Sequence, residues 1–241
     1  MAHAGSLVFP NLTGVCNTGL IKASEQFSKM EIMFKTEWII ASASIIWAII
    51  ALIAQVIIAR GRGRVDYSKR AGSVLQGIIY NFTWAMLPGH KETISHHPVK
   101  FTIGVLMHVG IFITIAKVLV LLINPRIPPS GSFAIGFFLG LASVCALYLF
   151  LRRVFSRDLH SMSSPDDYIS ILMTFGFMVM GIVHDLSLVS SGAFLIYAAV
   201  LFFYLPIGKL KHALFFFIAR ADYGARLGYR GTYPAKTGSR D

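Results

Sequence analysis

The sequence predicts an all-α membrane protein, a bundle of five transmembrane helices with the N-terminus outside and the C-terminus in the cytoplasm. Hydrophobic residues make up 55% of the 241 residues and charged residues only 14%. The mean hydropathy is +0.66, whereas a soluble domain of this length carries far more charge. The third observation is an uneven distribution of lysine and arginine between the segments that separate the apolar runs.

Each predicted span has close to the roughly 20 apolar residues that a bilayer requires. The five spans are expected at residues 38–59, 101–123, 132–151, 168–189 and 192–218. The further apolar segment 71–88 is short, contains two glycines and ends at a Pro-Gly pair. We therefore expect it to lie at the membrane interface or to be re-entrant, and not to form a sixth span.

The positive charges predict the orientation. Seven lysines and arginines follow the first span, three follow the third and seven follow the fifth, against four on the other side of the membrane. The positive-inside rule then divides the chain into an external tail (1–37), a membrane domain (38–219) and a basic cytoplasmic tail (220–241). The same rule accounts for the net charge of +11, so a nucleic-acid partner is not expected.

The fourth span has a recognisable start in Ser164-Pro165-Asp166-Asp167. Ser164 is a suitable cap, Pro165 suits the first helical position, and the two aspartates favour the positive end of the helix dipole. We expect these residues chiefly to begin the helix.

Three of the eight histidines lie within predicted spans: His108, His184 and His212. His108 lies seven residues into a span that runs outward, and His212 lies eight residues before Arg220 on a span that runs inward. At 1.5 Å per residue both reach roughly the same inner depth, about 10 Å from the cytoplasmic side. Two imidazoles at one depth on different helices are typical axial ligands of a b-type haem, although a histidine between helices is often only a hydrogen-bonded polar residue.

Lys209 and Lys211, beside His212, also require an explanation at this depth, because ionisable groups within a membrane are costly. Lys209 and Lys211 either reach the cytoplasmic interface or contact the anionic propionates of a haem. His184 lies near the outer end of its span, too far across the bilayer to share a flat ligand with His108 or His212.

Several stretches carry a resemblance to a known family. They are LRRVFSRDLHSMSSPDDYISILMTFGFMVMGI from residue 151, FFYLPIGKLKH, LPGHKETISHHPVKFTIGVLMHVGIF and RADYGARLGYRG. Over about residues 38–232 the chain resembles the b-type cytochrome subunit of respiratory nitrate reductase. It is more similar still to the membrane subunits of sulfite-reductase-associated complexes that partner heterodisulfide-reductase-like iron–sulfur proteins. The resemblance implies five spans, haem b, a membrane quinone and a bacterial or archaeal cytoplasmic membrane.

The resemblance also implies a ligand set. The family has two ligand histidines on the second span, which correspond to His108 and to about Val118. The two on its fifth span correspond to about Phe194 and to His212. One complete pair is therefore kept, and the pair for the outer haem is missing. We predict one haem b between His108 and His212, with His184 as a less favoured replacement ligand for an outer haem.

The outer half holds three further ionisable residues, Lys117, His184 and Asp185. Quinone chemistry needs hydrogen bonds to two carbonyl oxygens and a route for two protons, which these side chains can supply. One hypothesis is a quinone headgroup near Lys117 with His184 or Asp185 exchanging protons. The alternative is that Lys117 extends outward and pairs with Asp185.

Together these features predict a haem b subunit of a respiratory complex that moves electrons between quinone and a cytoplasmic iron–sulfur partner. The chain has neither iron–sulfur cysteine motifs nor a nucleotide-binding glycine loop, so we do not expect it to be catalytic alone. The alternative is a haem-free membrane anchor or quinone-binding subunit of such a complex. A transporter is disfavoured because no inverted repeat is visible.

Overall fold

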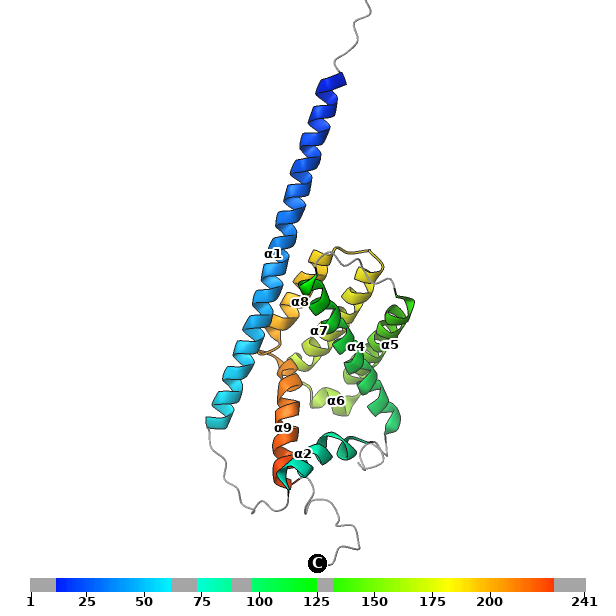
Figure 1. Ribbon diagram of the computed structural model, residues 1–241. Coiled ribbons are helices and arrows are strands. Elements are labelled where there is room, and N and C mark those ends of the chain that lie inside the picture. The colour runs from blue at the N-terminus through cyan, green and yellow to red at the C-terminus, as the bar shows by residue number, and fades with distance from the viewer. Residues whose placement is uncertain (1–11, 62–72, 88–96, 125–131, 228–241) are drawn as a thin grey trace, which may run out of the picture.

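The structure is a computed structural model that describes residues 12–61, 73–87, 97–124 and 132–227, with side chains from Lys35 onward. The described residues form helices and short connections, without a strand (Figure 1). The predicted tail beyond residue 227 and most side chains of the predicted N-terminal tail lie outside this description.

Four helices are long and apolar enough to cross a membrane, in agreement with the first four predicted spans. They are the Lys35–Gly61 part of α1 (Leu12–Gly61), α4 (Pro98–Ile123), α5 (Phe133–Phe155) and α7 (Pro165–Asp185). The chain is thus a multi-pass helical membrane protein by length and composition. Its helix α1 starts well before residue 38, where the first span was predicted to begin.

The fifth predicted span is not one continuous helix, which corrects the expectation for 192–218. Helix α8 (Ser191–Tyr204) is followed by the short helix η3 (Lys209–Lys211) and by α9 (His212–Leu227). The two parts meet at an angle of 82°, so the chain has five spans only if this bent pair counts as one.

Pro206 and Gly208 cause the break. Proline has no N–H to donate to the carbonyl of residue 202, and its ring clashes with that turn of a helix. The N–H groups of Ile207 and Gly208 instead both donate to the Tyr204 carbonyl, at 2.9 Å. Glycine is needed at 208 because a Cβ there would lie 2.3 Å from the Tyr204 ring.

Side chains of α1 satisfy carbonyls that the break releases. Trp47 Nε1 donates to the Phe203 carbonyl at 3.2 Å, and Gln55 Nε2 donates to the Pro206 carbonyl at 2.8 Å. In a membrane a released carbonyl has no water to bond, so such partners allow a broken helix. They also explain a glutamine within an otherwise apolar span.

Helix α2 (Val74–Phe82) and the turn η1 (Trp84–Met86) lie across the end of α9 and away from α8 (Figure 1). The crossing is close, since a Cβ on Gly224 would lie 2.7 Å from the Gly77 carbonyl oxygen. Asn81 is buried there and bonds Arg220 twice, through the Arg220 carbonyl at 2.6 Å and its guanidinium at 2.9 Å. With nine residues α2 is too short to span a bilayer; its interfacial location stays a prediction.

The start of α7 is as the sequence predicted. Pro165 occupies the first turn, and the Ser164 N–H donates to the Asp167 carboxylate at 2.9 Å. Asp167 also pairs with Arg153 at 2.7 Å, next to the short helix α6 (Arg157–Ser161).

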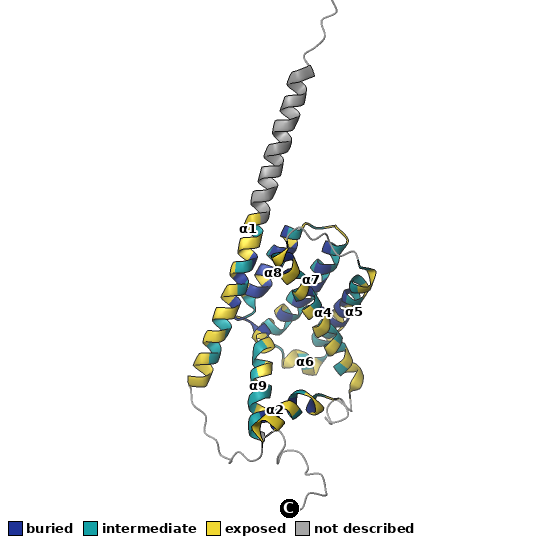
Figure 2. Ribbon diagram, in the orientation of Figure 1, coloured by how far each residue is buried: buried dark blue, intermediate teal, exposed yellow. Residues whose placement is uncertain are grey.

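Close packing is concentrated where α1, α4, α7 and α8 meet (Figure 2). Helix α1 packs on α8, and α5 packs on α4 and α7. Fully buried side chains of this core include Phe177, Phe194, Leu195 and Val118.

Candidate functional site

The structure brings together the two histidines that the sequence paired. The imidazole centroids of His108 on α4 and His212 at the start of α9 are 6.3 Å apart, with ring planes at 78°. A metal–imidazole bond of about 2 Å, plus roughly 1 Å from nitrogen to ring centre, puts two imidazoles on opposite sides of one metal ion about 6 Å apart. The observed separation fits that arrangement.

Each histidine is also oriented by its own backbone. His108 Nδ1 lies 2.6 Å from the Gly104 carbonyl, and His212 Nδ1 lies 2.6 Å from the Lys209 carbonyl. Because a carbonyl oxygen only accepts, each Nδ1 donates a proton, and in a neutral ring Nε2 then keeps its lone pair. Metal-ligating histidines are typically held in this way by their second nitrogen.

The surroundings of the pair leave room for a ligand. Both imidazoles are exposed, and a Cβ built on Gly104, one turn before His108, would meet no atom within 4 Å. No group of three or more His, Cys, Asp or Glu side chains that could hold a metal ion alone occurs among the described residues. A haem iron needs only two protein ligands, since the porphyrin supplies the other four, so the residues present fit this group.

Both lysines beside His212 are exposed. The Lys209 ammonium pairs with the Asp167 carboxylate. Lys209 thus already has an anionic partner in the protein, and the role of Lys209 and Lys211 toward haem propionates stays a prediction.

The positions that correspond to the missing ligand pair are filled by the protein core. Val118 and Phe194 are both fully buried in one apolar cluster. Phe194 stacks on Phe177 with centroids 6.0 Å apart and on His184 with centroids 5.2 Å apart. Side chains of the protein occupy this region, in contrast to the open surroundings of His108 and His212.

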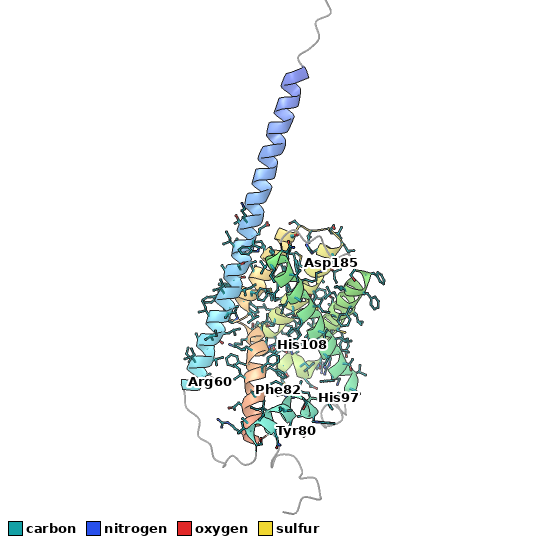
Figure 3. All side chains as sticks on the ribbon, viewed as in Figure 1. Arg60, Tyr80, Phe82, His97, His108 and Asp185 are labelled. Carbon is teal, nitrogen blue, oxygen red and sulfur yellow. The ribbon has the colours of Figure 1, made fainter. Side chains whose placement is uncertain are left out.

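Lys117, Asp185 and His184 lie close together at the end of the bundle opposite to His97 (Figure 3). The Lys117 ammonium pairs with the Asp185 carboxylate and donates to the Gly181 carbonyl at 2.8 Å. The side chains are 13% and 6% exposed, so this is a buried ion pair. It is the pairing that the alternative to the quinone hypothesis expected.

His184 differs from Lys117 and Asp185 in its hydrogen bonding. Its Nε2 lies 3.1 Å from Ser191 Oγ, whereas its buried Nδ1 has no hydrogen-bond partner among the described residues. Buried polar atoms are normally bonded, so an unbonded Nδ1 is unusual in this cluster.

Sequence reasoning missed the polar contacts that support the histidine pair. Gln55, Asn81 and Arg220 each join helices distant in sequence. A polar residue inside or next to an apolar run was the available signal, but the sequence does not show which helix it meets.

The chain matches no protein-family model, no curated protein and no solved structure in comparisons with known proteins.

Proposed function

We propose that this chain is the haem b-containing membrane subunit of a respiratory complex, which transfers electrons between membrane quinone and a cytoplasmic iron–sulfur partner. The observation that carries the proposal is the His108–His212 pair, with centroids 6.3 Å apart and each Nδ1 bonded to a carbonyl at 2.6 Å. When bound, haem b supplies one-electron chemistry at its iron.

The residues of the chain hold and orient this group. His108 and His212 present Nε2, and the Gly104 and Lys209 carbonyls fix the tautomer and rotation of the rings. The break at Pro206 and Gly208 contributes because it places His212 at the start of a new helix. If α8 continued without a break through residue 212, the rotation of α8 would determine the direction of the His212 side chain.

The quinone part of the proposal rests on His184. A quinol that is oxidised loses two electrons and two protons, and the buried Nδ1 of His184 can accept a hydrogen bond or a proton from a headgroup hydroxyl. The adjacent Lys117–Asp185 pair supplies a fixed positive and negative charge. In the orientation predicted by the positive-inside rule this cluster lies in the outer half, and the histidine pair in the inner half.

A reduced-minus-oxidised spectrum of the purified chain, with haem and protein quantified on one sample, tests the proposal. We expect one haem b per chain, lost in His108→Ala and in His212→Ala. His160→Ala is the matched control, because His160 is an exposed histidine whose Nδ1 lies 2.8 Å from the Tyr168 hydroxyl. A chain that binds no haem would contradict the proposal and favour the haem-free anchor or quinone-binding subunit.

The quinone site has its own test. His184→Gln should slow haem reduction by added quinol while leaving the haem spectrum and content unchanged, whereas His160→Gln should leave the rate as in the natural chain. An unchanged rate in His184→Gln would remove His184 from the proposal. Loss of haem in that variant would instead make His184 an iron ligand.

A further inference from the structure

Two matching rows of residues run from the histidines toward α2. On α9 the row is His212, Phe216 and Arg220, and on α4 it is His108, Gly104 and Lys100. Residues four apart lie on one face of a helix, so each row places a histidine, a spacer and a cation along one side. Helix α4 begins and α9 ends at the α2 end of the molecule, so both cations lie on the same side of the histidines (Figures 1 and 3).

The side chain of Arg220 reaches back along its row. Its guanidinium carbon lies 5.6 Å from the centroid of the Phe216 ring. Eight residues correspond to about 12 Å of helix rise, and a side chain that points toward the helix N-terminus shortens this separation. The guanidinium is thus directed toward the edge of any planar ligand that His212 binds.

Arg220 also has no anionic partner among the described residues. One Nη bonds the Asn81 side-chain oxygen at 2.9 Å and the other contacts the Met86 sulfur, which is a weak acceptor. Its Nε is buried without a partner, and no carboxylate pairs with it in the part of the chain that the structure describes. A partly buried cation without a counter-charge is costly, so this position favours an anionic ligand.

Lys100 offers a second cation from the facing helix. It is exposed and lies two helical turns before His108, with the open side of Gly104 between them. A macrocycle lying against Gly104 on one face and Phe216 on the other would extend toward both cations.

We propose that Arg220 and Lys100 bind the two carboxylates of the haem held by His108 and His212, and so fix its propionate edge toward α2. This inference rests on the proposed function. It differs from the earlier expectation, since Lys209 and Lys211 precede His212 in the chain and Lys209 pairs with Asp167.

A redox titration of the haem in the purified full chain tests the assignment. Loss of a cation next to a propionate leaves its negative charge uncompensated, which favours the oxidised haem. Arg220→Gln should lower the ratio of reduced to oxidised haem at a fixed potential about tenfold, or about 59 mV for a one-electron couple. Arg220→Lys should restore most of the potential, and Lys100→Gln should lower the ratio about two- to threefold because Lys100 is solvated.

Two controls separate this role from a structural one. Arg226→Gln removes an arginine of the same helix that pairs with Asp222, and it should leave the potential unchanged. Asn81→Ala breaks the contact between α2 and Arg220 but keeps the charge, so it should also leave the potential close to that of the natural chain. If Asn81→Ala reproduces the shift of Arg220→Gln, Arg220 acts by holding α2, and the assignment is wrong.

The remaining outcomes distinguish this inference from the proposed function. One haem per chain, with unchanged potentials in Arg220→Gln and Lys100→Gln, would overturn the propionate assignment alone. Absence of haem from the natural chain would overturn the proposed function and this inference with it.

Discussion

The two halves of helix α4 are both apolar on average but have different surroundings. From Pro98 to Val109 no residue is buried, whereas Gly110, Thr114, Val118 and Leu121 in the second half are all buried (Figure 2). The first half carries His108 and faces open space at Gly104. The second half packs against α5, α7 and α8.

This difference shows how one helix serves two purposes. In the second half, Val118 and its neighbours fill the core with protein atoms, and the Lys117–Asp185 pair joins α4 to α7. In the first half the helix surface is open at Gly104, one turn before an exposed and oriented histidine. Hydropathy alone does not identify these surroundings, because lipid, a cofactor and a protein core all select apolar residues.

Removal of one charge from the buried ion pair should have the largest effect on stability. Lys117→Met leaves the Asp185 carboxylate, only 6% exposed, without its cation. We expect a loss of about 3–5 kcal/mol in the free energy of unfolding, measured by denaturation in mixed micelles.

The double variant Lys117→Met/Asp185→Leu is the control, because it removes both charges and keeps apolar volume. Such replacements are often neutral or stabilising, so we expect its stability to lie within about 1 kcal/mol of the natural chain. Equal losses in the single and double variants would mean that packing, and not the uncompensated charge, determines the result.

Alanine substitutions at two glycines of α4, Gly104 in its first half and Gly110 in its second half, test the difference between the two halves directly. A Cβ on Gly110 would lie 2.3 Å from Ala142 Cβ and 2.9 Å from Met178 Sδ, so Gly110→Ala should cost about 1–3 kcal/mol. Gly104→Ala meets no atom within 4 Å and should leave the unfolding free energy nearly unchanged. The same micelle denaturation measures both.

A larger side chain extends this comparison to the ligand. Gly104→Leu should keep the stability of the haem-free chain but reduce its haem content, because the side chain would enter the space beside His108. Normal haem content in Gly104→Leu would place the macrocycle elsewhere along α4.

Much of the fold follows from hydropathy and local signals. The first four spans, the Ser164 start of α7 and the separation of α2 from the spans were all expected. The sequence also paired His108 with His212 from residue counts and the predicted orientation, and the two rings lie 6.3 Å apart; their depth in the membrane stays a prediction. The pairing of Lys117 with Asp185 was one of two alternatives, and the geometry that decides it depends on helix rotation.

The break between α8 and α9 could not be read with the same method. Apolar residues continue on both sides of Pro206, so an average over a long window does not register a four-residue interruption. Pro206 and Gly208 were visible signals, but whether a proline bends or ends a membrane helix depends on partners for the released carbonyls. Those partners, Trp47 and Gln55, lie about 150 residues earlier in the sequence, at separations of 156 and 151.

The smallest predicted effect tests whether the break between α8 and α9 helps to hold His212 opposite the first half of α4. Gln55→Leu removes the donor to the Pro206 carbonyl, and interhelical hydrogen bonds in membranes contribute about 0.6 kcal/mol on average and up to about 1.7. We expect a stability loss in that range, together with faster amide hydrogen exchange at residues 207–212.

Gln76→Leu is the matched control, because the Gln76 side chain is exposed on α2. Since His212 begins α9 directly after the break, Gln55→Leu should also weaken haem retention more than its small stability loss explains. Unchanged exchange and retention would show that Pro206 and Gly208 maintain the break without α1.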